Sequence, residues 1–393
     1  MKPQSSTVLH ILTPGDHYSP ATGSAIVTVV YELSKWHQIA GRETLLVVSK
    51  NTRHDYDVGV CIEVMDRPEP VRRQRIVDAL MGRAGLPRVF SRAAYAPSVA
   101  AIPSEFTGTV MLHNAAGCAP SARKAAPLAN LCLYCHNNLF STYSNFEVRR
   151  TLNAVDKIVC VSNFIADLIK KRLGSDDPRV FVALNGVDTE RFKPPVSHQN
   201  MLPPLILFVG RVQPQKGPDL LIKAGCILAE RGVDFRIRIV GSSNFSADDP
   251  LTEYESQLRQ IARPIADKVE FVPFVDRTGI VSHYLDADVF CAPSNWDEPV
   301  SLTVPEAMAS GIATVASRRG GIPEVGADAL LYFEPPDVNE LAHQIETLIV
   351  SRGLRDQMGQ RARQRSEEIS WRRRYDALWK GVLNPSPQDA HTS

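Results

Sequence analysis

The amino-acid sequence of 393 residues has no long hydrophobic run. No apolar stretch approaches the roughly 18 residues that a membrane-spanning helix needs. The N-terminal segment contains only a short apolar stretch before Thr13-Pro14-Gly15, which is too brief for a secretory signal. We therefore expect a cytoplasmic location.

The sequence also lacks an excess of charge of one sign. Its 44 Lys and Arg residues balance 43 Asp and Glu residues, so the formal net charge is +1. This balance excludes a protein that coats nucleic acid through its net charge, and it excludes a disordered acidic chain. We expect no nucleic-acid partner.

Cysteines are few: the chain has 7, an odd number, spread along its length. This usage fits a reducing compartment better than a disulfide framework. The one close pair, Cys132 and Cys135, lies in the segment LCLYCH, which is typical of a buried strand. Residues three apart point to opposite faces of a strand, so we expect core thiols rather than a metal or redox pair.

Short apolar runs alternate with helical patterns along the whole chain, which predicts βαβ units and parallel sheets in an α/β fold. At ~100–200 residues per domain, two Rossmann-like lobes account for the length, and ligands would bind beyond the carboxyl ends of their strands. The expected strands are 8–12, 45–49, 109–112, 131–135, 157–161, 205–209, 236–240, 269–272, 289–292 and 313–316. The expected helices are 23–39, 163–173, 217–230, 251–262, 302–309, 337–351, 354–369 and 371–382.

Turn residues and a double proline in NGVDTERFKPPV, residues 185–196, indicate a boundary between the lobes. We expect a first lobe at 1–190, a second at 196–370, a C-terminal helix at 371–384 and a disordered tail at 385–393.

The segment GRVQPQKG follows an expected strand directly and contains Arg211 and Lys216. Two cations at the carboxyl end of a strand, just before a helix that opens at Gly217, suit a ligand that bears phosphate. The alternative is a solvated loop with two surface charges, and position alone does not decide between them.

A second segment, NWDEPVSLTVPEAMASG, follows another expected strand and contains Glu298 and Glu306. These carboxylates can accept hydrogen bonds from sugar hydroxyls, and the free N–H groups around Leu302 and Thr303 can hold a diphosphate. For Glu306 the alternative is a carboxylate that stabilises the helix dipole.

Together these two segments and GIATVASRRGGIPEVG resemble the retaining nucleotide-sugar glycosyltransferases of family four, which have the GT-B fold. The linker NGVDTERFKP and the segment CVSNFIADLI are similar to that family too. The resemblance is strong in the second half and loose before Lys157. It implies two Rossmann-like lobes that face a central cleft, a C-terminal helix that packs back on the first lobe, an acceptor in the first lobe and a nucleotide-sugar in the second.

By this resemblance, Arg211 and Lys216 would bind the diphosphate of the donor, together with the backbone at Leu302 and Thr303. Glu298 would hold hydroxyls of the donor sugar, and Glu306 would hold the ribose hydroxyls. Val275, in the segment FVPFVD, lies where the family contacts the base through its main chain.

In the first lobe, Gly23 heads a helix where the family has a glycine pair beside the diphosphate and the acceptor. Here the pair is Thr22-Gly23, and the acidic residue usual a little further on is missing. His136, in LYCHNN, matches the histidine near the reacting sugar carbon and is favoured over its rival His113.

Two Asp-x-Asp patterns, at 55–57 and 286–288, are the arrangement that chelates a metal in other transferases. Because Arg211 and Lys216 can offset the phosphate charge, we expect no metal and no cofactor. The nucleoside-diphosphate sugar is the co-substrate, with UDP favoured over GDP and ADP.

Runs of like charge are by default solvated helix faces. Those in the first lobe can also attract anionic lipid, which would allow peripheral contact at the inner face of the membrane and suit a lipid-linked acceptor. The runs are Arg72-Arg73, Arg149-Arg150, Lys170-Lys171-Arg172 and Arg372–Arg374.

The sequence thus indicates a metal-independent, retaining hexosyltransferase that acts on a sugar, lipid-linked or small-molecule acceptor in glycan, polysaccharide or glycoconjugate biosynthesis. His136, Glu298, Arg211 and Lys216 are the expected catalytic residues. A nucleotide-sugar 2-epimerase of the same fold and a non-catalytic nucleotide-sugar-binding protein stay open as alternatives. An oxidoreductase is disfavoured, because residues 12–17 lack the Gly-x-Gly-x-x-Gly turn.

Overall fold

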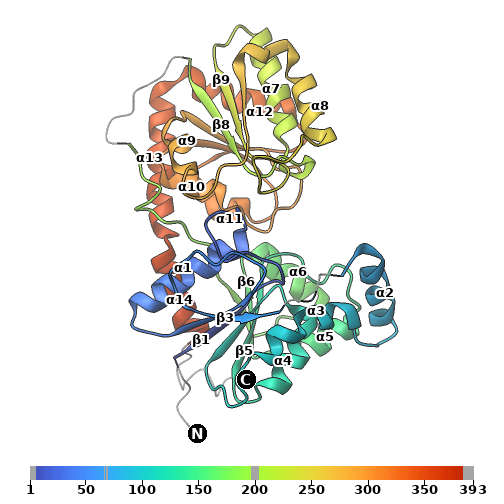
Figure 1. The fold of residues 1–393 in the computed structure, drawn as a ribbon. Helices are drawn as coiled ribbons and strands as arrows, with labels where there is room; N and C mark the ends of the chain where they lie inside the picture. Colours follow the sequence, from blue (N-terminus) through green and yellow to red (C-terminus); the bar gives the residue numbers. More distant parts are fainter. Residues whose placement is uncertain (1–5, 66, 68–69, 196–202, 384–393) are drawn as a thin grey trace. The chain divides into compact units, whose positions relative to one another are not determined.

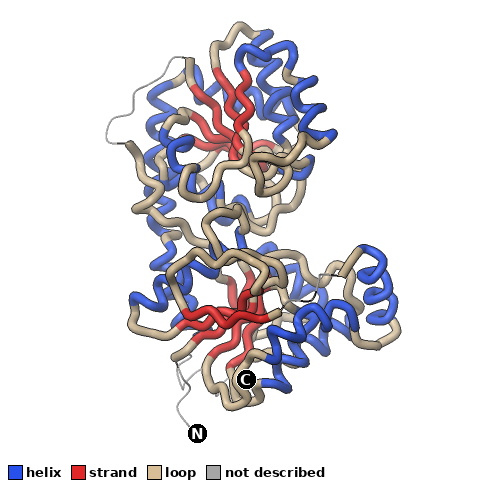
Figure 2. Tube along the Cα trace, viewed as in Figure 1, coloured by secondary structure: helices blue, strands red, loops and turns tan. Residues whose placement is uncertain are grey.

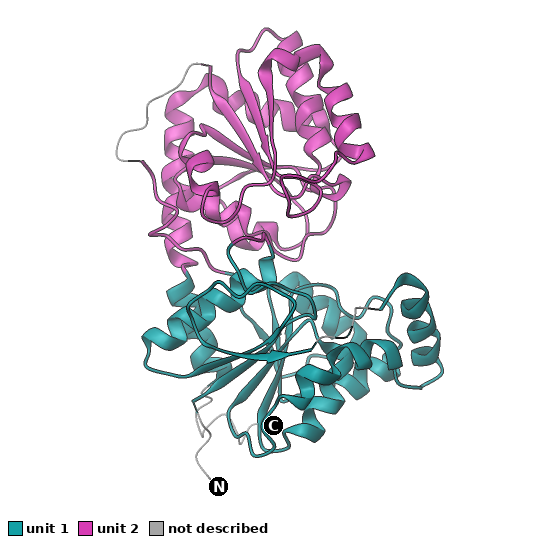
Figure 3. Cartoon of the chain, in the orientation of Figure 1, with its two compact units in different colours: residues 1–20, 24–185, 371–393 teal, residues 21–23, 186–370 magenta. Residues whose placement is uncertain are grey.

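The computed structural model describes residues 6–65, 67, 70–195 and 203–383. These form two compact units, shown in Figure 3: the first comprises residues 1–20, 24–185 and 371–393, and the second comprises residues 21–23 and 186–370. The division after Asn185 lies at the start of the segment in which the sequence places the boundary. The expected disordered tail, 385–393, lies outside the described residues.

The first unit is built on a seven-stranded sheet in the order β3-β2-β1-β4-β5-β6-β7, with every described pair parallel. Helices cover the sheet (Figure 2), so its central strands are continuous apolar runs rather than alternating ones. All six residues of β5 are buried, which confirms that Cys132 and Cys135 are core residues. The strands are β1 (Val8–Ile11), β2 (Thr44–Ser49), β3 (Val60–Val64), β4 (Thr109–His113), β5 (Asn130–Cys135), β6 (Lys157–Cys160) and β7 (Val180–Val182).

The helices of the first unit begin and end where the sequence supplies capping groups. The hydroxyl of Ser162 accepts from the N–H of Ile165 at the start of α6, and Gly174 ends that helix with a φ of 77°. The helices, of which the α-helices are labelled in Figure 1, are α1 (Ala25–Ile39), α2 (Arg72–Arg83), α3 (Val89–Ala100), η1 (Ala116–Cys118), α4 (Ala119–Ala125), α5 (Asn145–Leu152), α6 (Asn163–Leu173), α14 (Trp371–Leu378) and η4 (Trp379–Leu383).

The second unit has a six-stranded parallel sheet in the order β10-β9-β8-β11-β12-β13. The chain runs outward from β8 to β10 and then returns to the other side of β8, so the topological switch point lies between β8 and β11. Open α/β sheets bind ligands beyond the carboxyl ends of the strands at such a point. The strands are β8 (Leu205–Val209), β9 (Arg236–Val240), β10 (Val269–Val272), β11 (Val289–Ala292), β12 (Ala313–Ser317) and β13 (Leu331–Phe333).

Helices cover this second sheet as well, and the apolar sides of α7 and α12 pack together in its core. Pro305 lies in the first turn of α10, the one part of a helix where proline costs no hydrogen bond. The helices are η2 (Pro214–Lys216), α7 (Pro218–Glu230), α8 (Glu253–Ile261), η3 (Arg263–Lys268), α9 (Ile280–Leu285), α10 (Thr303–Ala309), α11 (Ile322–Gly326), α12 (Val338–Val350) and α13 (Arg352–Glu368).

The C-terminal helix α14 belongs to the first unit and packs on α1, which confirms the expectation that it returns to the first lobe. The hydroxyl of Tyr375 lies 2.8 Å from Nδ1 of His37 and accepts from Nη1 of Arg42 at 2.9 Å. The guanidinium of Arg42 lies 3.6 Å from the centre of the Trp379 ring. Aromatic packing and one shared hydroxyl therefore hold the end of the described chain on the first unit.

The Tyr375→Phe substitution is expected to destabilise the first unit by about 1–3 kcal/mol, because it leaves a buried histidine nitrogen and an arginine without their shared partner. Urea unfolding followed by tryptophan fluorescence measures the loss. Tyr332→Phe is the matched control, since its hydroxyl donates only to the carbonyl of Ala327 at an exposed position. Equal, small effects from both substitutions would contradict this account of α14.

Candidate active site

The loops after β8 and β11 bring Lys216 and Glu298 together at the switch point of the second unit. Lys216 ends the 3-10 turn η2, and its ammonium group pairs directly with Oε1 of Glu298. The second carboxylate oxygen of Glu298 accepts a hydrogen bond from Oγ of Ser294 at 2.5 Å. The side chain of Glu298 is 6% exposed and that of Lys216 is 22% exposed, so the carboxylate is nearly buried and the ion pair is partly buried.

The charge state of Glu298 follows from its partners. Burial by itself raises the pKa of Glu298, but the charge and hydrogen bond of Lys216, the hydrogen bond of Ser294 and the charge of Arg211 together lower the pKa below its ordinary value. Arg211 itself is exposed. Glu298 is therefore an anion at neutral pH, with the half-buried cation Lys216 and the exposed cation Arg211 near it.

Glycines let the neighbouring loops approach this pair closely. Gly320 has a φ of 54°, and a Cβ added there would lie 2.0 Å from the carbonyl oxygen of Glu298. The N–H of Gly321 donates to that same oxygen at 2.8 Å. A Cβ on Gly217 would lie 2.0 Å from the carbonyl oxygen of Pro293. The Gly-Gly pair of GIATVASRRGGIPEVG thus positions the backbone of Glu298.

Glu306 lies on α10 in a separate cluster of the same unit. Its Oε1 pairs with Nη1 of Arg277 at 2.8 Å, and its Oε2 accepts from the hydroxyl of Tyr284 at 2.9 Å. The carboxylate is thus paired and hydrogen-bonded in a buried position, rather than simply stabilising the helix dipole. Sequence reasoning missed both Arg277 and Ser294, because neither stands in a motif and each approaches its glutamate only in the folded unit.

The remaining predicted donor-site residues lie at loop and helix starts. Leu302 is the N-cap of α10 and Thr303 is its first helical residue, so their N–H groups precede the first intrahelical hydrogen bonds. Val275 is half-buried in the loop between β10 and α9. The N–H of Phe274 donates to Oγ of Ser242 at 3.0 Å, which ties that loop to the one after β9.

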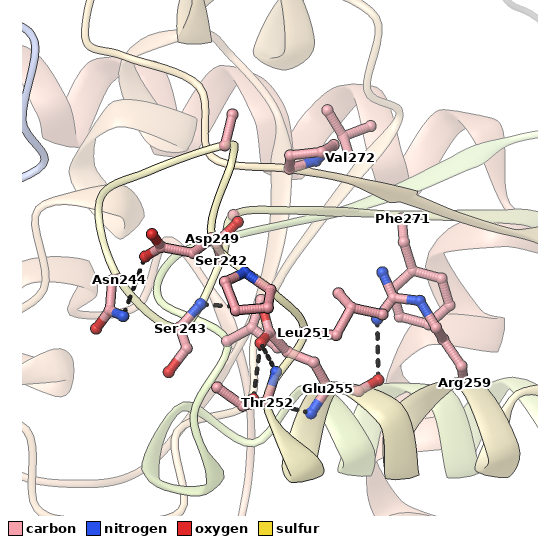
Figure 4. Close-up of a pocket in the computed structure, with 15 residues that line it drawn as sticks. Ser242, Ser243, Asn244, Asp249, Leu251, Thr252, Glu255, Arg259, Phe271 and Val272 are labelled. Atoms are coloured by element: carbon pink, nitrogen blue, oxygen red, sulfur yellow. Dashed lines mark hydrogen bonds between the residues drawn. The ribbon is translucent and has the colours of Figure 1, made fainter.

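A pocket opens at the carboxyl ends of β9 and β10, beside the loop that carries Arg211 (Figure 4). Its polar wall is ordered by Glu255, which accepts from the N–H of Ser243 at 3.1 Å and forms a capping box with Thr252. Its apolar wall includes Val212, Phe271 and Val272. A hollow with an apolar wall and ordered polar groups suits a flat, polar ring.

The predicted helix start near Gly23 is confirmed by α1 of the first unit, since Ser24 caps this helix by accepting from the N–H of Val27. The helix itself begins at Ala25, two residues after Gly23. Gly23 lies in the short segment, residues 21–23, that is grouped with the second unit.

His136 and its rival His113 lie together in the first unit and are joined directly. Nε2 of His136 lies 2.9 Å from Nδ1 of His113, and Nε2 of His113 lies 2.8 Å from Nδ1 of His10. All three rings are buried. Burial lowers the pKa of His136 to about 3, and burial with its histidine neighbours lowers the pKa of His113 well below its ordinary value. Sequence reasoning did not identify His10.

The Asp-x-Asp pattern at 286–288 has structural partners. Asp286 pairs with Nη1 of Arg238 at 2.8 Å, and Oδ2 of Asp288 accepts from the N–H of Leu205 at 2.8 Å. Within the described ranges, no three His, Cys, Asp or Glu side chains gather in a way that could hold a metal ion.

No helix in the described part of the chain has both the length and the apolar character needed to cross a membrane.

Comparison with known proteins follows the division into two units. Residues 189–365 match the family model of glycosyl transferases group 1, and residues 26–191 match the model of glycosyltransferase family 4. Spore coat protein SA of Bacillus subtilis (strain 168) is 29% identical over 273 residues, which cover 65% of this chain and 72% of that protein. D-inositol 3-phosphate glycosyltransferase 2 of Catenulispora acidiphila is 34% identical over 193 residues, 46% of this chain and 44% of that protein.

Solved structures show the same architecture. Anabaena HepE in complex with UDP and glucose superposes with a TM-score of 0.70 at 16% identity, covering 96% of this chain and 99% of that chain. Sucrose-phosphate synthase from Thermosynechococcus elongatus gives a TM-score of 0.71 at 19% identity, covering 95% and 97%. At these identities the likeness shows the fold alone. The two family models together cover residues 26–365, and the solved structures share the fold. The chain is therefore a glycosyltransferase of the group 1 and family 4 type, with the GT-B fold.

Proposed function

We propose that this glycosyltransferase moves a hexosyl unit from a nucleoside-diphosphate sugar to an acceptor hydroxyl, with retention of the anomeric configuration and without a metal. The observation that carries the proposal is the partly buried Lys216–Glu298 pair at the switch point, with Arg211 near it. The solved complexes of HepE with UDP-glucose and with UDP and glucose favour UDP as the nucleotide.

In this proposal the ammonium group of Lys216 contacts both Glu298 and the donor diphosphate. The exposed side chain of Arg211 binds the diphosphate from the solvent side. Glu298, ionised and oriented by Ser294, accepts hydrogen bonds from hydroxyls of the donor sugar. Each carboxylate oxygen can accept two hydrogen bonds, so Glu298 can hold its lysine and a sugar together.

Glu306 is the proposed partner of the ribose hydroxyls. Arg277 and Tyr284 each occupy one of its oxygens, which leaves one acceptor position on each oxygen for a hydroxyl group. The backbone at Leu302 and Thr303 is proposed to help hold the diphosphate, and the main chain at Val275 is proposed to contact the base.

The proposed reaction breaks the bond from the anomeric carbon to the diphosphate oxygen and forms a bond to the acceptor oxygen on the same face of the sugar. The proton of the acceptor hydroxyl passes to the departing diphosphate oxygen. Lys216 and Arg211 stabilise the negative charge that develops on the leaving diphosphate. Such electrostatic stabilisation is usually the largest single contribution to the rate enhancement. His136, in the first unit, is proposed to hydrogen-bond near the reacting carbon.

A basic pocket in the first unit suits an acceptor with an anionic group. It lies among α3, α4 and α5, and its wall includes Arg92, Lys124 and Arg150. Among the described residues that line it, Glu147 is the one carboxylate, and Glu147 is bound by Arg88 at 2.8 Å. The relatives named D-inositol 3-phosphate glycosyltransferase also support a phosphorylated acceptor.

Helix α2 is proposed as the point of a peripheral membrane contact at the cytoplasmic face. Its apolar side chains Ile76, Val77 and Leu80 are exposed, and the helix begins with the pair Arg72-Arg73. Exposed apolar groups beside arginines suit the surface of an anionic bilayer. This placement would give the enzyme access to a lipid-linked acceptor in glycan or glycoconjugate biosynthesis.

Incubation with UDP-, GDP- and ADP-sugars, with and without phosphorylated and neutral sugar acceptors, tests the proposal. We expect acceptor-dependent release of UDP and a product with the donor's anomeric configuration. Isomerisation of the donor without an acceptor would instead identify a 2-epimerase, and binding without turnover would identify a nucleotide-sugar-binding protein.

Transfer activity is expected to survive saturating EDTA within about twofold, because the cations of the protein offset the phosphate charge. Initial rates before and after chelation measure this. Complete loss of activity that Mn²⁺ or Mg²⁺ restores would contradict the metal-independent mechanism.

The two glutamates are expected to differ in kinetics. Glu298→Gln removes the charge that orients the reacting sugar, so kcat should fall at least ~10-fold with little change in UDP affinity. Glu306→Gln weakens a contact to the ribose, which does not react, so KM should rise and UDP affinity should fall. Calorimetric titration with UDP beside kcat for both variants measures the difference. The reverse pattern would exchange the two roles.

A further inference from the structure

Three histidines form a continuous row across three neighbouring strands of the first unit. His10 is in β1, His113 ends β4, and His136 follows β5 directly. These strands are adjacent in the sheet order β1-β4-β5. The row therefore runs from inside the sheet to its carboxyl edge, where α/β proteins bind their ligands.

Strand register explains why the three rings share one face of the sheet. His10 pairs with Met111 in register, so His10 and His113 are two residues apart on the same face. His113 pairs with Tyr134, and His136 is again two residues further on. The ring centres are 5.1 Å apart at each step, with angles of 25° and 29° between the planes.

Two further residues hold the outer end of the row. The ring of Tyr134 stacks on both His113 and His136, with centres 5.3 Å and 4.5 Å apart. The side-chain oxygen of Asn114 accepts from the backbone N–H of His136 at 2.8 Å, and Asn114 itself has a φ of 54°. The plane of the His136 ring is therefore set by packing before any ligand binds.

The two nitrogen–nitrogen distances of 2.8 Å and 2.9 Å restrict the hydrogens of all three rings. Each contact needs one nitrogen with hydrogen and one without, and each neutral ring carries a single N–H. The contacts join Nδ1 of one ring to Nε2 of the next. Consequently either all three rings carry hydrogen on Nε2, or all three carry it on Nδ1.

We propose that His10 and His113 are positioning residues that couple the tautomer of His136 to their own, so that the state of the whole row decides whether its remaining nitrogen, Nδ1, accepts a hydrogen bond from the substrate or donates one to it. The inference rests on the proposed function only in placing His136 beside the reacting sugar. The hydrogen bond at one ring nitrogen of a histidine generally determines whether the other nitrogen carries hydrogen. For His136 that bond is made by His113, whose own tautomer depends on its contact with His10.

The test combines a spectroscopic and a kinetic measurement on the full chain. Nitrogen-15 NMR of the histidine-labelled protein distinguishes the two tautomers, with single-histidine variants to assign the signals. We expect all three rings to be neutral at pH 7.5 and to share one tautomer. Mixed tautomers among His10, His113 and His136 would overturn the proposal.

His10→Phe removes both nitrogens at the inner end and keeps a planar ring. It should release the row, so the His136 signals should move toward a mixture of tautomers. If the unsubstituted chain transfers sugar, kcat of the variant should fall about tenfold, because one neutral hydrogen bond to the substrate is lost. The KM for the donor should stay within twofold of its value in the unsubstituted chain.

His343→Gln on the exposed side of α12 is the control and should change neither measurement. Unchanged His136 signals in His10→Phe, or unchanged kcat once the signals have moved, would each overturn the proposal. The spectroscopic arm needs no turnover, so a chain that fails to transfer sugar would contradict the proposed function while the row is still tested.

Discussion

Replacement of Lys216 by glutamine is expected to lower kcat by roughly 100–1000-fold, because one preorganised donor to a developing anion contributes ~3–4 kcal/mol to the transition state. In the proposed reaction this lysine is the partly buried cation that meets both the leaving diphosphate and Glu298. Arg211→Gln, at the exposed side of the same site, should be at least as severe. Steady-state kinetics with a UDP-sugar, under saturating acceptor, measure both losses.

The same substitution also removes the cation that pairs with a nearly buried carboxylate, which costs stability as well as rate. Kinetics are therefore measured well below the melting temperature of each variant. Lys223→Gln is the matched control, since Lys223 lies on α7 of the same unit and pairs with Asp219 at 2.8 Å on the surface. Near-normal rates for both Lys216→Gln and Arg211→Gln would contradict the proposal that these two side chains bind the diphosphate.

Acidification from pH 7.5 to pH 5 is expected to destabilise the first unit by several kcal/mol. Burial lowers the pKa of His10 and of His136 to about 3 each, so the unfolded chain binds more protons than the folded one as pH falls below 6.5. At pH 5 this costs ~2 kcal/mol for each histidine, taken separately. The two costs do not add fully, because the rings belong to one hydrogen-bonded row. His37, whose pKa burial lowers to about 4, adds to the loss.

Urea unfolding at a series of pH values, followed by tryptophan fluorescence, measures this slope. Carboxylates with a lowered pKa, such as Glu147 and Asp177, lose their stabilising effect only below about pH 4.5, so the window from 7.5 to 5 isolates the histidines. His10→Phe should reduce the loss at pH 5 by less than the ~2 kcal/mol that His10 costs when taken separately. Stability that is flat between pH 7.5 and 5 would show that the row is not buried in its neutral form.

Several features of the fold were predictable because they depend on local patterns. Helix α6 was expected at 163–173 and is found there, since a serine cap and a terminal glycine mark both of its ends. Strands β3, β7 and β13 were not expected. All three lie at sheet edges, β3 and β7 have no buried residue and β13 has one, so none forms the long buried apolar run of an inner strand.

The sequence by itself determined that two parallel α/β sheets form. It also determined that Lys216, Glu298 and Glu306 follow strands, because the ends of strands and the starts of helices depend on residues that are neighbours in the chain. The tertiary structure alone decided which of these groups meet. Lys216 and Glu298 are 82 residues apart in the chain, and His10 and His113 are 103 apart. Such pairs are set by the order in which strands join a sheet and by their register, and no local pattern encodes either one.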